Sequence, residues 1–173
     1  MKQLYLIGGP MGVGKTSVSR RLAAMLERSV LLDGDWCWMT HPFTVTDETK
    51  AMVMDNIAYL LANFLRCGEI DHVILAWVLH EQAIIDELLA RLPLEGCEVV
   101  SVSLVCDAVT LTRRLQKDID AGLRTPDVIQ RSLARLALYD ALNTCKIDTS
   151  GRNIRETAQA ILALSRDDAG KAI

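Results

Sequence analysis

Short apolar runs and amphipathic segments alternate along the whole chain. The runs are rich in Leu, Ile and Val, which is typical of strands that are buried on both faces of a sheet. The segments between them repeat apolar residues at intervals of three and four, which predicts helices with one buried face. The predicted strands cover residues 4–7, 29–32, 72–78, 99–105 and 145–148. The predicted helices cover residues 15–26, 47–67, 81–92, 108–121, 125–142 and 153–165.

This alternation of strands and helices predicts an α/β fold, in which right-handed crossovers connect the strands of a parallel sheet. Ligands of such sheets bind beyond the carboxyl ends of the strands. The segments that directly follow predicted strands include residues 8–17, 33–35, 77–80 and 148–152. We therefore expect these segments to line one crevice.

The segment after the first strand contains a phosphate-binding motif. Residues 9–16 read Gly-Pro-Met-Gly-Val-Gly-Lys-Thr, which matches G-x-x-x-x-G-K-T between a strand and a helix. Glycines allow backbone N–H groups to turn toward phosphate oxygens, and the helix start adds its positive dipole end. Lys15 is expected to reach the β- and γ-phosphates, and the Thr16 hydroxyl to ligate Mg²⁺. The motif thus predicts ATP and Mg²⁺ as cofactors, bound by Gly9, Met11, Gly12, Val13, Gly14, Lys15, Thr16 and Ser17.

Two acidic residues follow the second predicted strand, in the segment Asp33-Gly34-Asp35. Phosphoryl transfer to a hydroxyl requires a group that orients and deprotonates the acceptor, and a carboxylate near Mg²⁺. We predict Asp35 as the catalytic base and Asp33 as the partner on the Mg²⁺ side, directly or through water. An Asx-rich turn that ends the strand is the alternative interpretation. Which of the two acids is the base stays open at this point.

The overall composition narrows the class of protein. The chain has 173 residues, of which half are hydrophobic and 24% charged, so we expect one globular domain over residues 1–173. A net charge of -3 gives no reason to expect a nucleic-acid partner. The five cysteines form no C-x-x-C pair, which fits a reducing cytoplasm better than a metal cluster or disulfide framework. The N-terminal apolar run is too short for a signal peptide, and no run is long enough to cross a bilayer, so no membrane partner is expected.

The glycine loop, together with the Leu-Asp-Gly-Asp segment about 18 residues after Lys15, resembles the small P-loop kinases. This group includes shikimate, gluconate, adenylylsulfate and nucleoside monophosphate kinases, the chloramphenicol phosphotransferase and the tunicamycin-resistance type proteins. The resemblance implies a three-layer αβα sandwich with a five-stranded parallel sheet in the order 2-3-1-4-5 and a short helical lid at about residues 114–126. It also implies that Arg114 lies near the adenine and that Arg124 acts as a catalytic cation on the phosphates. Lys117-Asp118 departs from the family, in which many members have a further lid arginine here.

Other polar and aromatic residues allow two interpretations each. Trp36, Trp38, Phe43 and Trp77 are predicted either to wall an acceptor pocket or, for Trp77, to belong to the core. His80-Glu81 is expected to cap a helix rather than touch the acceptor. The arginines after the lid, Arg131 and Arg135, are expected on a solvated helical face.

The residues and the resemblance together predict an ATP-dependent small-molecule kinase. It would transfer the γ-phosphoryl group of Mg-ATP to a hydroxyl of a sugar, sugar acid, nucleoside or antibiotic, as a monomer or homodimer in the cytoplasm. The alternatives are a nucleoside or nucleotide monophosphate kinase and a nucleotide-binding regulatory protein without kinase activity. The sequence predicts Lys15, Asp35 and Arg124 as catalytic residues, Thr16 and Asp33 as metal ligands, and Arg114 as a nucleotide contact.

Overall fold

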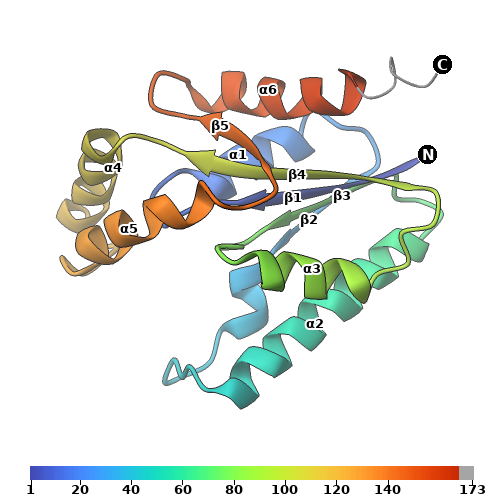
Figure 1. Ribbon diagram of the computed structural model, residues 1–173, viewed down its shortest axis with the longest axis horizontal. Coiled ribbons are helices and arrows are strands. Elements are labelled where there is room, and N and C mark those ends of the chain that lie inside the picture. Colours follow the sequence, from blue (N-terminus) through green and yellow to red (C-terminus); the bar gives the residue numbers. More distant parts are fainter. Residues whose placement is uncertain (168–173) are drawn as a thin grey trace.

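A five-stranded parallel sheet forms the middle layer of the computed structural model, which describes residues 1–167 (Figure 1). The strands lie in the order β2-β3-β1-β4-β5, as the resemblance implied. All four neighbouring pairs are parallel. Their bounds are β1 Lys2–Gly8, β2 Ser29–Asp33, β3 His72–Ala76, β4 Cys97–Val105 and β5 Cys145–Asp148.

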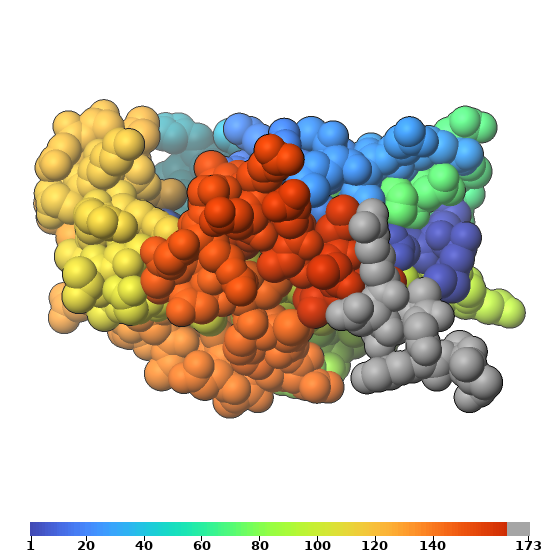
Figure 2. Space-filling view, turned by 90° about the horizontal axis from the view of Figure 1, so that it is seen from above, coloured from blue at the N-terminus to red at the C-terminus, as the bar shows by residue number. Residues whose placement is uncertain are grey.

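Helices cover both faces of the sheet and its carboxyl end. On one face lie α1 (Lys15–Ala23) and α6 (Ile154–Asp167), which Figure 2 shows side by side from above in blue and red-orange. On the other face lie α2 (Asp47–Arg66) and α3 (Gln82–Ala90). The helices α4 (Ala108–Asp120) and α5 (Val128–Leu136) stand beyond the carboxyl ends of the strands (Figure 1). Within residues 1–167, no helix combines the length and apolarity that a membrane span requires.

The position of β1 between two helical layers explains why residues 4–7 are apolar without alternation. Leu4 and Leu6 are fully buried in the core on the side of α2 and α3. Tyr5 and Ile7 are fully buried in the second core, which lies on the side of α1 and α6. Because successive side chains of a strand point to opposite faces, a strand between two helical layers must be apolar at every position.

The structure differs from the prediction where chain segments leave regular structure near the site. The strand β3 ends at Ala76, two residues early, and the Val78 carbonyl accepts hydrogen bonds from the Gly9 N–H (3.3 Å) and the Tyr139 hydroxyl (2.7 Å). The predicted helix over residues 125–142 is shorter, since α5 begins at Val128, and a 3₁₀ helix η2 (Ala137–Tyr139) follows it. This 3₁₀ turn directs the buried Tyr139 toward the sheet, which periodicity alone did not indicate.

Candidate phosphate-transfer site

The glycine loop between β1 and α1 forms one wall of the candidate site. Gly9, Gly12 and Gly14 have φ values of 148°, 84° and 107°, which side-chain-bearing residues rarely adopt. At Gly12 a Cβ atom would also lie only 2.5 Å from the Leu115 side chain of α4. Gly14 is the N-cap of α1, and the first turn of this helix contains no acidic residue. The helix start is therefore suited to an anion.

Lys15 stands at the start of α1 and closes the loop. Its ammonium donates hydrogen bonds to the carbonyl oxygens of Gly9 (2.7 Å) and Pro10 (2.9 Å). The Lys15 pKa is lowered from 10.5 to about 8, mainly by burial. The carboxylates of Asp35 and Asp33 oppose this shift, and the positive charges of Arg124 and Arg135 add to it. The structure thus gathers three cations and two acids around the loop.

Thr16 and Asp33 meet on the metal side of the predicted site. The Thr16 hydroxyl donates a hydrogen bond of 3.0 Å to Oδ2 of the buried Asp33, whose Oδ1 accepts the Asp35 N–H at 3.2 Å. A hydroxyl and a carboxylate are hard oxygen donors of the kind that Mg²⁺ prefers, together with water and phosphate oxygens. The residues present therefore fit the metal that the sequence predicts.

Asp35 lies on the 3₁₀ helix η1 (Gly34–Trp38), directly after β2. Burial is the main reason that the Asp35 pKa is raised, and the nearby negative charge of Asp33 adds to the effect, while the positive charges of Lys15 and Arg124 reduce it. A carboxylate with a raised pKa close to the phosphate loop has the properties of a general base.

The aromatic residues divide between the core and the surface. Trp77 is buried in the core, and a Cβ atom at Gly34 would lie 2.4 Å from its ring, so the glycine between the two acids is required by close packing. Trp36 and Phe43 are 52% and 65% exposed. The Trp38 and Phe43 rings pack in a tilted arrangement, with their centroids 5.3 Å apart. The residues of η1 and the loop after it therefore offer apolar surface near Asp35, whereas Trp77 supports it from below.

The opposite wall is formed by α4 and the turn that leads to α5. The Arg114 guanidinium donates to the Val13 carbonyl (3.1 Å) and to the Thr149 hydroxyl and carbonyl (2.8 Å each), so it connects the glycine loop to the segment after β5. Arg124 forms an ion pair with Asp118, at 3.0 Å from Nε to Oδ2. A hollow of about 380 Å³ separates this turn from Met11 of the glycine loop.

Arg135 is exposed, as the sequence analysis expected, but its charge also acts on residues of the site. Its positive charge lowers the pKa of Lys15, and it also acts on His80 and Tyr139. The His80 pKa is lowered mainly by burial, and its Nδ1 atom is buried with no hydrogen-bond partner among residues 1–167. Arg135 and Tyr139 are four residues apart and so share a helical face, and this spacing was the available signal. Glu81 precedes α3 but makes no side-chain cap, since its carboxylate pairs with His80 at 3.2 Å.

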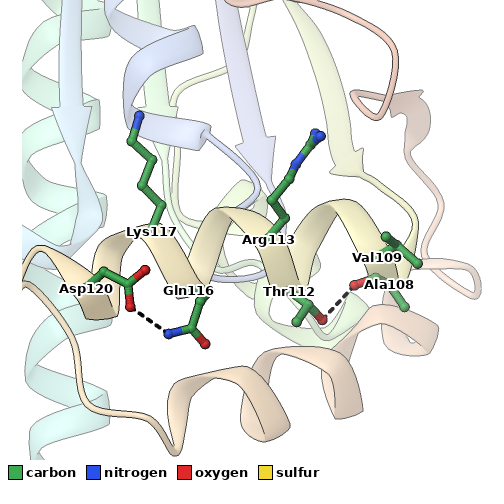
Figure 3. Close-up of a pocket in the computed structure, with 7 residues that line it drawn as sticks. All are labelled: Ala108, Val109, Thr112, Arg113, Gln116, Lys117 and Asp120. Carbon is green, nitrogen blue, oxygen red and sulfur yellow. Dashed lines mark hydrogen bonds between the residues drawn. The ribbon is translucent and has the colours of Figure 1, made fainter.

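A larger hollow lies elsewhere, along the exposed side of α4 (Figure 3). All the residues that line it belong to this one helix, among them Arg113, Lys117 and Asp120. Asp120 accepts a hydrogen bond from Gln116 at 2.8 Å. With no residue of the glycine loop or of η1 in its lining, this hollow is separate from the phosphate site.

Comparisons with known proteins agree with this geometry. The family model AAA_18, described as an AAA domain, matches residues 6–125. Since the match covers well over half of the chain, the protein belongs to the AAA domain family. No curated protein matches the sequence.

Solved structures place the fold more narrowly. A gluconokinase from Sinorhizobium meliloti 1021 is similar with a TM-score of 0.71 and 20% identity, over 99% of this chain and 98% of that one. The Deinococcus radiodurans tunicamycin resistance protein has a TM-score of 0.69 and 22% identity, with 95% and 96% covered. Shikimate kinase from Acinetobacter baumannii, in complex with shikimate, has a TM-score of 0.64 and 24% identity, with 100% and 96% covered. The fold is thus that of the small P-loop kinases.

Proposed function

We propose that the protein is an ATP-dependent phosphotransferase that acts on a hydroxyl group of a small molecule. One observation carries the proposal: the Thr16–Asp33 contact of 3.0 Å joins the glycine loop to the segment that bears Asp35. It brings a metal-binding pair and a candidate base to the phosphate loop of a small-kinase fold. The structural neighbours, which include kinases of different small molecules, support this class of enzyme.

In the proposed reaction, ATP lies with its phosphates on the glycine loop. Lys15 and the lid cation Arg124 stabilise the negative charge on the transferring group, and Arg114 stands on the adenine side. Thr16 and Asp33 would hold Mg²⁺, which would neutralise further negative charge on the phosphates. Asp35 accepts the proton of the attacking hydroxyl as the bond to the γ-phosphorus forms and the bond to the leaving oxygen breaks.

The charge around the crevice favours an acceptor that carries an anionic group. Arg135 supplies a cation beyond those that the phosphates of ATP require, and its charge also acts on His80. A guanidinium binds a carboxylate or phosphate with its planar fork. Hydroxy acids and sugar acids are therefore stronger candidates than neutral sugars.

A thermal-shift screen with the non-hydrolysable analogue AMPPNP and Mg²⁺ tests the proposal. A true acceptor raises the melting temperature further, because ligands of the folded state stabilise it by mass action. Hits are then tested for acceptor-dependent conversion of ATP to ADP, with each hydroxy acid compared with its neutral alcohol. A nucleotide-binding regulatory protein would bind AMPPNP but would not convert ATP to ADP with any of the acceptors. Preference for a nucleoside monophosphate would instead favour the nucleotide-kinase alternative.

A further inference from the structure

The last turn of α4 contains a carboxylate, Asp118, that the proposed reaction does not use. Asp118 is six residues before Arg124, yet the turn brings the two side chains together at 3.0 Å. The turn is closed by hydrogen bonds from the Leu123 N–H to the Asp118 carbonyl and from the Gly122 N–H to the Ile119 carbonyl, both 2.9 Å. Asp118 therefore contacts the turn twice, with its backbone carbonyl at Leu123 and with its carboxylate at Arg124.

The ion pair uses only one edge of the arginine. The donor to Asp118 is Nε, and the two terminal nitrogens of Arg124 make no hydrogen bond to any residue in the described part of the chain. These nitrogens carry the paired N–H groups with which a guanidinium binds phosphate in bidentate geometry. Asp118 thus fixes the guanidinium without occupying the atoms that would bind a phosphate.

The free edge of the guanidinium belongs to the phosphate crevice. Arg124 lines the hollow that Met11 of the glycine loop closes from the other side. Its charge acts on both Lys15 and Asp35. Before nucleotide binds, these neighbouring cations repel one another, and the Asp118 carboxylate that pairs with Arg124 offsets that repulsion.

We propose that Asp118 is a positioning residue, which holds Arg124 by Nε so that its terminal nitrogens face the γ-phosphate of bound ATP. This inference rests on the proposed function, because it needs a triphosphate on the glycine loop. It gives a physical reason for an acidic residue at this place in the lid: the side chain orients the existing arginine instead of adding another.

The test compares the affinities for AMPPNP and ADP, each with Mg²⁺, by titration calorimetry, so that no acceptor is needed. The ratio of the two affinities reports contacts with the γ-phosphate. Arg124→Ala should lower this ratio about tenfold or more, since hydrogen bonds to charged groups are strong. Asp118→Ala should lower it about three- to tenfold with little change in ADP affinity, whereas Asp118→Glu, which keeps the charge, should restore most of the ratio.

The double variant separates positioning from a general structural effect. Asp118→Ala should change nothing further in the Arg124→Ala background, because an effect that acts through the arginine disappears with it. Asp120→Ala is the matched control, since it removes an acid from the same helix at its exposed side (Figure 3). Melting temperatures confirm that each variant is folded, and Asp118→Asn replaces the alanine variant if that one unfolds.

The possible failures can be told apart. If the wild-type protein binds neither nucleotide, the proposed function is wrong, and the inference falls with it. If Arg124→Ala lowers the ratio but Asp118→Ala leaves it unchanged, only the role of Asp118 is overturned. An increased ratio in Asp118→Ala also overturns it, because Asp118 would then compete with the phosphate for the arginine.

Discussion

The glycine loop and the turn between α4 and α5 face the same crevice, but different interactions hold them in place. The loop is fixed by its own backbone, with three glycines at positive φ and the Lys15 ammonium bound to two loop carbonyls. The turn depends on the Arg124–Asp118 ion pair, in which both side chains are 34% exposed. Exposed pairs of this kind contribute on the order of 0–1 kcal/mol and weaken in salt.

This difference matches the tasks that phosphoryl transfer sets. A preorganised cradle must hold the phosphates without rearrangement, since reorganisation at the moment of reaction would cost rate. A cation that covers the γ-phosphate must also let the nucleotide enter and leave, which weak and local contacts permit. The contrast therefore suggests a rigid wall and an adjustable wall, and each prediction below tests one of them or the group between them.

Asp35, which the charges of both walls influence, should give the largest effect. Asp35→Asn removes the base while keeping the size of the side chain, so acceptor-dependent turnover should fall roughly 10²–10⁴-fold. Nucleotide affinity should change little, because the glycine loop is untouched. The comparison variant is Asp33→Asn, which should instead raise the Mg²⁺ concentration needed for half-maximal activity. If the two variants exchange these phenotypes, Asp33 is the base.

The rigid wall is tested by Lys15→Ala. The loop backbone stays in place, but the variant loses charge stabilisation that increases in the transition state, so turnover should fall on the order of 10²–10³-fold. Lys50→Ala, at an exposed position on α2, should be unaffected. Activity of Lys15→Ala within about threefold of wild type would mean that the lysine contributes under 1 kcal/mol and has no catalytic role.

The two walls also differ in how far the sequence predicted them. The glycine loop was predictable because its function lies in consecutive residues: the spacing of three glycines, Lys15 and Thr16 sets the conformation locally. The strand order was implied by the resemblance to the small P-loop kinases, whereas the closeness of Asp33 to the glycine loop was expected from the rule that parallel strands end at one edge. Strand β1 was evident because burial on both faces makes residues 4–7 apolar at every position.

The adjustable wall, which is the turn between α4 and α5, was less predictable, since its contacts join residues that the sequence does not mark as partners. Nothing in the spacing of Asp118 and Arg124 indicates an ion pair, because residues six apart do not meet on a regular helix. Arg135 is exposed, as predicted, but nothing in its spacing indicated that its charge acts on Lys15. The aromatic residues were ambiguous because only tertiary packing separates the buried Trp77 from the exposed Trp36.

The segment that carries the acids should be as rigid as the glycine loop, and Gly34→Ala tests this. The new Cβ would lie 2.4 Å from the Trp77 ring, and overpacking of this kind costs about 1–3 kcal/mol. The melting temperature should fall by roughly 3–10 °C for a chain of this length. Gly68→Ala is the matched control, since a Cβ there meets no atom within 4 Å. Equal melting temperatures for the two variants would show that the acid segment tolerates displacement.

The adjustable wall should respond to a milder change. Arg124→Lys keeps the charge but loses the planar fork, so turnover should fall about three- to tenfold. The loss should grow with salt concentration, because a lysine held only by exposed charges is more easily screened. Arg91→Lys, in a surface ion pair with Asp55, controls for arginine replacement in general. Unchanged turnover at all salt concentrations would place Arg124 outside the reaction.

The smallest effect should come from the titration of Lys15. Its measurement distinguishes the glycine loop from the turn that bears Arg124, and it requires no acceptor. The Lys15 pKa is about 8 in the nucleotide-free protein, and phosphate nearby favours the charged form and raises it. Binding of Mg-ADP should therefore take up part of a proton near pH 8, and affinity should fall about fourfold between pH 7 and pH 8.5 as the free lysine loses its proton. Calorimetry in two buffers of different ionisation enthalpy measures the uptake. Arg124→Ala should retain the proton uptake that is due to Lys15, and Lys15→Ala should lose it. Any protons that the nucleotide itself takes up are the same in both variants. Uptake that persists unchanged in Lys15→Ala would assign the titration to another group and leave the lysine fully charged in the empty loop.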